Sequence, residues 1–169
     1  RAPLSERHVN FLTQTLTEFF QLLLGRIRLR ELLKTLQRGK VVIVELAGSW
    51  CTTCKDATPW LVELHKRLTP RGLELLTLLY EFTDDQEYNR KQAIAFKGAY
   101  RIPWDVIPID GDIGDLATIL PPGIENIDIS GFPISLFVDR KGLLRDVHAG
   151  FASAVSPAYA EITSAYEAN

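Results

Sequence analysis

The run Val41-Val42-Ile43-Val44-Glu45-Leu46 constrains the fold of this chain more than any other segment. A strand that is apolar on both faces belongs in the middle of a sheet, where other elements cover both sides. A Gly-Ser-Trp turn follows at 48–50, and the apolar residues between Cys51 and Leu68 then recur at helical spacing. A buried strand that leads directly into a helix is typical of β–α–β units, and it predicts an α/β fold.

The rest of the chain extends this unit. Strand and helix patterns alternate over 73–82 (strand), 85–100 (helix), 104–109 (short strand), 134–138 and 143–148 (hairpin strands) and 159–166 (helix). Before residue 40, the pattern fits a hairpin over 20–29 and, nearly as well, a helix over 9–23, and it predicts a short helix over 30–37. The order predicts a central mixed sheet with helices on both faces.

Composition excludes several classes of protein. The chain has 169 residues, 46% of them hydrophobic, which suits one globular domain rather than a disordered chain. The net charge of -2 lacks the basic excess of a duplex-binding domain, so no nucleic-acid partner is expected. No apolar run reaches about 18 residues, so no transmembrane segment is expected in this chain. The chain begins at Arg1, and we expect a mature or trimmed form.

The two cysteines, Cys51 and Cys54, stand three residues apart at the predicted start of a helix. Free backbone N–H groups and the helix dipole stabilise a thiolate there, and the thiolate is the species that attacks disulfides. Cys51 is therefore expected to be the nucleophile. Cys54, one turn deeper, is placed to resolve a mixed disulfide formed on Cys51.

Two other interpretations of the cysteine pair stay open. The pair could be half of a zinc site, although His8, His65 and His148 show no ligand-like spacing. It could also be an inert structural disulfide, although so small a loop constrains the unfolded chain little.

The segment Trp50-Cys51-Thr52-Thr53-Cys54-Lys55, with Pro59 beyond it, resembles the active-site motif of the thioredoxin superfamily. The strand at 41–46 is similar to the central strand of that family. Gly131-Phe132-Pro133, just before a strand, is similar to its cis-proline loop. The resemblance implies a thioredoxin-like fold over one domain, 1–169.

Within the superfamily, the chain is most similar to the TlpA/ResA-like, redoxin-like group of extracytoplasmic thiol–disulfide oxidoreductases. Phe137-Val138-Asp139-Arg140-Lys141-Gly142 is similar to a strand-and-turn signature of that group. The resemblance implies an N-terminal extension at 1–39 and a core at 40–169. That core includes an insertion at about 83–110, before the cis-proline loop.

The sequence departs from the family pattern beside the cysteines. The residues between them are Thr52 and Thr53 rather than a pair that contains Pro, which bears on the redox potential. Many members of the group have Glu three residues after the second cysteine, where this chain has Ala57. We expect Ala57 in place of Glu to change the pKa of the thiols more than it changes the reaction.

Glu45 is the one polar residue of its strand, and it lies six positions before Cys51, where thioredoxins hold a buried acid. A carboxyl group in an apolar site has a raised pKa and can take the proton of Cys54. A strand-edge Glu that reaches solvent is the alternative.

Three residues are expected to bind substrate. Pro133, if cis, holds a fixed turn beside the cysteines, and the backbone of Phe132 can then pair with an extended substrate segment. Trp50 can shield the thiol and offer an apolar platform, or it can serve the core alone.

His148 is expected on the surface of its strand.

The resemblance implies a thiol–disulfide oxidoreductase that needs no cofactor and reduces protein disulfides through a Cys51/Cys54 dithiol–disulfide cycle. It implies a periplasmic or other extracytoplasmic protein, membrane-tethered before trimming, with a membrane electron donor. A peroxiredoxin-like peroxidase is one alternative, but residues 47–50 lack the expected Pro. A module that binds copper through the cysteines and a His is the other.

Overall fold

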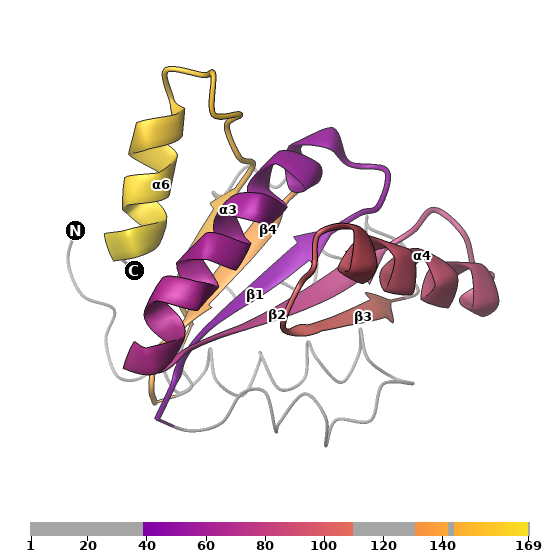
Figure 1. Cartoon of the computed structure of the whole chain (residues 1–169), viewed down its shortest axis with the longest axis horizontal. Helices are drawn as coiled ribbons and strands as arrows, with labels where there is room; N and C mark the ends of the chain where they lie inside the picture. The colour runs from indigo at the N-terminus through magenta and orange to yellow at the C-terminus, as the bar shows by residue number, and fades with distance from the viewer. Residues whose placement is uncertain (1–38, 110–130, 142–143, 169) are drawn as a thin grey trace.

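The computed structural model describes residues 39–109, 131–141 and 144–168 (Figure 1). The elements expected before residue 39, and any helical turn between 110 and 130, lie outside these ranges. The domain boundaries expected from the sequence, an extension at 1–39 and a core at 40–169, therefore remain predictions.

The described residues form one five-stranded sheet in the order β3-β2-β1-β4-β5. The strands are β1 (Val41–Ala47), β2 (Leu73–Tyr80), β3 (Asp105–Ile109), β4 (Ile134–Val138) and β5 (Leu144–Ala149). β1 pairs in parallel with β2, and β2 with β3, whereas β4 runs antiparallel to both β1 and β5. This is the mixed sheet that the sequence predicts, with its most apolar strand at the centre.

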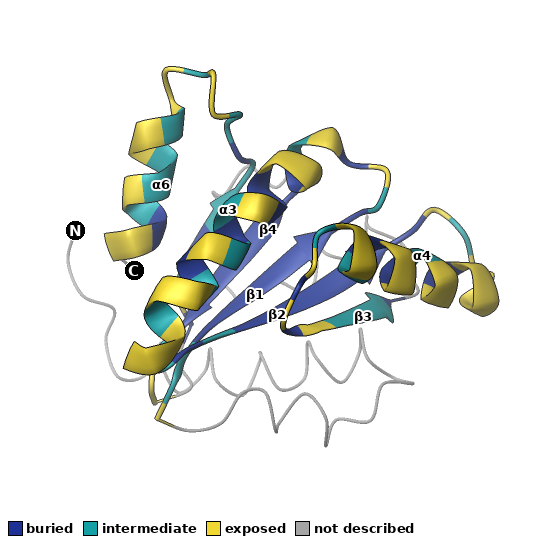
Figure 2. Cartoon of the chain, viewed as in Figure 1, coloured by how far each residue is buried: buried dark blue, intermediate teal, exposed yellow. Residues whose placement is uncertain are grey.

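Three helices cover one face of the sheet: α3 (Thr52–Leu68), α4 (Gln86–Ala99) and α6 (Tyr159–Ala168) (Figure 1). A short 3₁₀ helix, η1 (Thr69–Arg71), links α3 to β2. Figure 2 shows β1 and β2 almost wholly buried, the edge strand β3 partly exposed, and the helices exposed along their outer sides. Within the described ranges, helices lie on one face only, so the expected helices of the other face are not tested.

Alternation along β1 decides what each of its residues contacts. Val42, Val44 and Leu46 pack in the apolar cluster on the face away from the described helices. Ile43 and Ala47 pack in the cluster on the helix-covered face, together with both cysteines. Glu45 lies between Ile43 and Ala47, so its side chain belongs to the layer between the sheet and the helices.

The region expected to be an insertion contributes α4 and β3. Asp85 caps α4 by accepting hydrogen bonds from the N–H groups of Glu87 and Tyr88, each at 3.0 Å. β3 then adds a parallel strand to the outer edge of β2. β2 itself ends at Tyr80, two residues earlier than expected, because Glu81 and Phe82 leave the sheet toward the cysteine turn.

Candidate active site

The two cysteines form a disulfide at the point where β1 leads into α3. Their Cα atoms are 5.3 Å apart, within the usual range for such a bond. Cys51 is the N-cap of α3, and Cys54 lies in its first turn. Both side chains are buried, and Cys54 is the more deeply buried of the two.

A backbone N–H group and a hydroxyl group lie against the sulfur of Cys51. The backbone N–H of Cys54 donates to Cys51 Sγ at 3.0 Å, and the hydroxyl oxygen of Thr53 lies 3.2 Å from the same sulfur. When the disulfide is reduced, these donors and the helix N-terminus favour the thiolate of Cys51 over the thiol. The arrangement suits the nucleophile that the sequence predicts.

The turn before Cys51 is fixed by three contacts. The ring of Trp50 packs so closely over Gly48 that a Cβ atom there would lie 2.4 Å from it. The indole N–H of Trp50 donates to the carbonyl of Tyr80 at 3.0 Å, and the N–H of Ser49 donates to the buried carboxyl group of Glu81 at 3.0 Å. Only a glycine at 48 allows the ring to lie here.

The loop at 131–133 lies against the start of α3. The Phe132–Pro133 peptide bond is cis. The hydroxyl of Thr53 donates to the carbonyl of Phe132 at 2.8 Å, which joins two segments that are 79 residues apart in the sequence. The structure therefore brings Trp50, Phe132 and Pro133 to the same end of the sheet as the cysteines.

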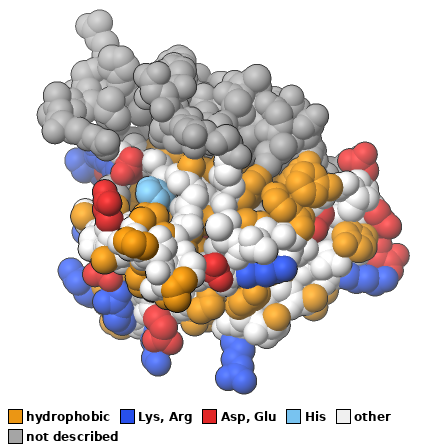
Figure 3. Space-filling model, turned by 90° about the horizontal axis from the view of Figure 1, so that it is seen from above, with side chains coloured by type: hydrophobic (Ala, Val, Ile, Leu, Met, Phe, Trp, Pro, Cys, Tyr) orange, Lys and Arg blue, Asp and Glu red, His pale blue; other side chains and the backbone are white. Residues whose placement is uncertain are grey.

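Aromatic rings form a rim beside the disulfide. The ring centroid of Trp50 lies 4.3 Å from that of Phe82 and 5.3 Å from that of Phe132. Trp50 is 37% exposed and Phe82 67% exposed, so the rim is accessible to a partner. Figure 3 looks onto the end of the molecule where α3 begins, and it shows hydrophobic side chains there with most charged side chains toward the margin.

Glu45 is buried in the layer between the sheet and the helices, the layer that also holds both cysteines. The hydroxyl of Ser135 donates to its Oε2 atom, and its Oε1 atom is buried with no hydrogen-bond partner in the described part of the chain. Burial raises the pKa of Glu45 to about 8, and the hydrogen bond from Ser135 opposes that rise only in part. The carboxyl group is therefore largely protonated at neutral pH.

A row of polar side chains crosses the sheet at this level. Strand register places Thr77, Glu45, Ser135 and His148 on four neighbouring strands, one opposite the next. The hydroxyl of Ser135 also lies 2.6 Å from the hydroxyl of Tyr166 on α6. Burial and, to a smaller extent, the negative charge of Glu45 when it is ionised raise the pKa of Tyr166, so its hydroxyl stays neutral.

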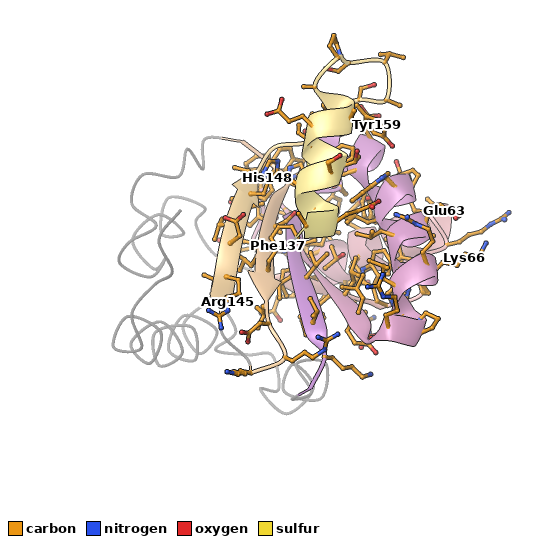
Figure 4. All side chains as sticks on the ribbon, turned by 90° about the vertical axis from the view of Figure 1, so that its left-hand side faces the viewer. Glu63, Lys66, Phe137, Arg145, His148 and Tyr159 are labelled. Atoms are coloured by element: carbon orange, nitrogen blue, oxygen red, sulfur yellow. A yellow bond between two sulfur atoms is a disulfide. The ribbon has the colours of Figure 1, made fainter. Side chains whose placement is uncertain are left out.

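His148 differs from the expectation of a strand-surface residue. It is half-buried, its ring lies 5.2 Å from that of Tyr166, and its Nε2 atom is buried without a hydrogen-bond partner among the described residues. Burial lowers its pKa. Figure 4 shows His148 on the sheet next to α6. His148 is half-buried because this helix covers a part of β5 that the sequence pattern leaves open to solvent.

Four polar residues of the site were not singled out for it from the sequence: Thr53, Glu81, Ser135 and Tyr166. Only Thr53 carried a signal, as part of the unusual Thr-Thr pair between the cysteines. The other three reach the site through register and packing, which no local pattern reveals.

Across 39–109, 131–141 and 144–168, no group of three or more His, Cys, Asp or Glu side chains is arranged to hold a metal ion. In those ranges no helix has the length and apolar character needed to cross a membrane.

No family model matches the chain. Among curated proteins, it is 27% identical over 113 residues to the thiol:disulfide interchange protein DsbE of Pseudomonas fluorescens biotype C, covering 67% of this chain and 53% of that protein. It is 25% identical over 114 residues to the thioredoxin-like protein YneN of Bacillus subtilis strain 168, covering 67% and 58%. The chain thus spans a little over half the length of these relatives.

Among solved structures, the chain resembles the thiol:disulfide interchange protein, a thioredoxin family protein, of Chlorobium tepidum TLS. The TM-score is 0.51 at 25% identity, over 69% of this chain and 73% of that one. The fold and the cysteine pair at a helix N-terminus define a thioredoxin-fold protein. The relatives, a thiol:disulfide interchange protein and a thioredoxin-like protein, are consistent with that fold and with its cysteine pair.

Proposed function

We propose that this protein is a thiol–disulfide oxidoreductase that reduces disulfides in polypeptides. The observation that carries the proposal is the Cys51–Cys54 disulfide, with Cys51 as the N-cap of α3 and the Cys54 N–H and the Thr53 hydroxyl within 3.2 Å of its sulfur. The relatives named thiol:disulfide interchange proteins support the same chemistry.

The substrate half of the cycle starts from the dithiol. The Cys51 thiolate attacks one sulfur of a substrate disulfide, a mixed disulfide forms, and the other substrate sulfur leaves as a thiolate. Cys54 then loses its proton and attacks Cys51 Sγ, which closes the protein disulfide and releases the second substrate thiolate. Two electrons pass from the protein to the substrate, and the substrate thiolates take up two protons.

Glu45 holds the proton that Cys54 needs. When an external dithiol attacks Cys51 in the closed disulfide, Cys54 departs as a thiolate, and the protonated carboxyl group of Glu45 supplies its proton. In the substrate half of the cycle the carboxylate takes that proton back. A pKa of about 8 suits both directions near neutral pH, because the protonated and the ionised form of the carboxyl group are then both populated.

The aromatic rim receives the polypeptide around the substrate disulfide. Trp50, Phe132 and the exposed Phe82 offer apolar area beside Cys51, and the loop of Phe132 and Pro133 offers backbone groups to an extended chain. A polypeptide that presents an apolar residue next to its cysteine matches this surface.

The cycle requires a dithiol donor that reduces the Cys51–Cys54 disulfide again. We place the protein in a periplasmic or other extracytoplasmic compartment, at the membrane and supplied by a membrane electron donor. The resemblance to thiol:disulfide interchange proteins supports this placement, since disulfides persist in such compartments and need a dedicated reductant there.

A redox titration tests the proposal. The protein is equilibrated in a dithiothreitol or glutathione series, and free thiols are counted by alkylation and mass. We expect one two-electron transition with a midpoint near the thioredoxin value of roughly -270 mV. A midpoint near roughly -120 mV would indicate an oxidant instead. No reversible transition would overturn the proposal.

A further inference from the structure

We infer that the Thr53 hydroxyl couples the redox state of the cysteines to substrate binding. In the disulfide form it donates to the Phe132 carbonyl. In the dithiol form it donates to the Cys51 thiolate and leaves that carbonyl free for a backbone N–H of the substrate polypeptide. The inference rests on the proposed function, and it names the residue that makes the reduced form the better binder.

The starting geometry is a single hydroxyl between two acceptors. Thr53 Oγ1 lies 2.8 Å from the carbonyl oxygen of Phe132 and 3.2 Å from Cys51 Sγ. A threonine hydroxyl has one proton to donate. In the disulfide, Cys51 Sγ carries no proton and no charge, so the carbonyl oxygen is the better acceptor, and it is also the nearer one.

Reduction reverses that preference. The Cys51 sulfur becomes a thiolate beside the N-terminus of α3, and a hydrogen bond to a charged acceptor is roughly twice as strong as one to a neutral acceptor. Because Oγ1 is already within reach of both atoms, only the hydroxyl hydrogen has to rotate. The change needs no movement of the backbone.

Substrate binding depends on whether the Phe132 carbonyl is available as a hydrogen-bond acceptor. While Thr53 donates to it, one of the two acceptor positions of that carbonyl is taken, so a substrate backbone N–H meets a weaker and more crowded acceptor. Once the hydroxyl has turned to the thiolate, the Phe132 carbonyl lies open next to the nucleophile, where an extended chain can pair with it. The reduced protein thus binds the disulfide substrate, and closure of the Cys51–Cys54 disulfide restores the Thr53–Phe132 bond and promotes product release.

The adjacent Thr52 provides the matched control. It has the same side chain and also lies between the cysteines in α3, but it is exposed, whereas Thr53 is half-buried against the loop of Phe132. The variants are Thr53→Val, which keeps the branched shape without the hydroxyl, Thr53→Ser, which keeps the hydroxyl, and Thr52→Val. All three leave the nearby charged groups, Lys55, Asp56 and Glu81, in place.

The first measurement is the pKa of the Cys51 thiol in the fully reduced protein, from the pH dependence of its alkylation by iodoacetamide. Thr53→Val removes a donor to the thiolate, so we expect this pKa to rise by about one pH unit. Thr53→Ser and Thr52→Val are expected to keep the wild-type value. This readout does not depend on any substrate.

The second measurement compares the two redox forms as binders. The probe is an extended peptide with apolar flanking residues and Ser in place of Cys. Its binding is measured by the change in the fluorescence of the protein. For the wild type, Thr53→Ser and Thr52→Val, we expect the reduced form to bind about three- to tenfold more tightly than the oxidised form, as one hydrogen bond allows. In Thr53→Val the two dissociation constants are expected to be equal.

The inference is overturned if Thr53→Val keeps both the wild-type thiol pKa and the wild-type ratio of dissociation constants. It is also overturned if Thr52→Val has the same effects as Thr53→Val. Neither result touches the proposed function, which fails only if the wild-type pair has no reversible redox transition. In that event, a comparison of the Cys51 thiol pKa in wild type and Thr53→Val still decides whether the Thr53 hydroxyl donates to the Cys51 thiolate.

Discussion

The two sides of the Cys51–Cys54 disulfide have opposite electrostatic character. Around Cys51, a backbone N–H, the Thr53 hydroxyl and the N-terminus of α3 all favour negative charge, and an exposed aromatic rim borders the site. Behind Cys54, the layer between sheet and helices is apolar and holds a buried, largely protonated Glu45.

The difference separates two tasks. In the proposed mechanism the outer side stabilises the attacking thiolate and receives the partner, whereas the inner side disfavours charge and holds a proton. A resolving cysteine in an apolar layer does not ionise before it is needed, because its charge would be buried without a partner. Each experiment below changes one side and leaves the other intact.

The largest effects are expected at the cysteines. Cys51→Ser removes the nucleophile and should lower disulfide exchange roughly a thousandfold or more. Cys54→Ser keeps the attack but cannot resolve it, so a mixed disulfide should accumulate on Cys51. Mass analysis under non-reducing conditions, with an oxidised polypeptide as substrate, measures both. A stable mixed disulfide formed by Cys51→Ser would reverse the assigned roles.

Glu45→Gln is expected to slow reduction of the disulfide by an external dithiol about a hundredfold at neutral pH, because Gln cannot supply a proton to Cys54. In the wild type, the rate constant per donor thiolate should fall as the pH rises past about 8, where Glu45 becomes ionised. In Glu45→Gln it should not depend on pH. Stopped-flow mixing with dithiothreitol measures the profile.

Glu63→Gln is the control for this rate, since Glu63 points away from the sheet on the exposed side of α3 (Figure 4). It is expected to keep the wild-type profile. If Glu45→Gln shows the same profile as Glu63→Gln, the buried carboxyl group takes no part in proton transfer.

Glu45 should also make the oxidised protein less stable as the pH rises. Its pKa is about 8 in the folded protein and near 4.5 in the unfolded chain, so its contribution to stability is complete below pH 4.5 and is lost as the pH rises through about 8. The loss is on the order of 3 kcal/mol. Urea unfolding at pH 5 and pH 8 measures it.

In Glu45→Gln, the free energy of unfolding should lack the pH dependence that Glu45 contributes. The lowered pKa of His148 acts in the opposite direction, but it is common to both proteins and cancels in the comparison. An identical change in unfolding free energy between the two pH values in wild type and Glu45→Gln would contradict a carboxyl group that folding keeps protonated.

A smaller loss is expected from Tyr166→Phe. The variant removes the hydroxyl that meets Ser135 and keeps the ring, so the free energy of unfolding should fall by about 1 kcal/mol. Tyr159→Phe, on the same helix and half-buried, is the matched control and should stay within about 0.5 kcal/mol of wild type. Equal losses in the two variants would mean that the Ser135 contact adds no stability.

The smallest effect is expected at the rim. Phe82→Ala should raise KM about threefold for polypeptide substrates with apolar residues near the cysteine, and leave the rate with glutathione disulfide unchanged. Ile94→Ala, an exposed apolar residue on α4, is the control and should change neither. An equal effect of Phe82→Ala on both substrates would point to the turn at Trp50 rather than to substrate contact.

The sequence by itself determined the central strand, the helix after it and the position of the cysteines between them. These are local properties: β-branched residues in a row, apolar residues at helical spacing and a Cys-x-x-Cys pair at the junction. The apolar residues on both sides of Glu45 also predicted a carboxyl group with a raised pKa. The mixed sheet followed from the order of the elements.

Only the tertiary structure decided what surrounds the pair. Strand register set Ser135 opposite Glu45, and the docking of α6 brought Tyr166 to the same hydroxyl and covered His148. The loop of Phe132 met Thr53 across 79 residues. The acidity of a buried group depends on such distant neighbours, because desolvation and hydrogen bonding act through space, whereas a sequence pattern reports only the period of its own segment.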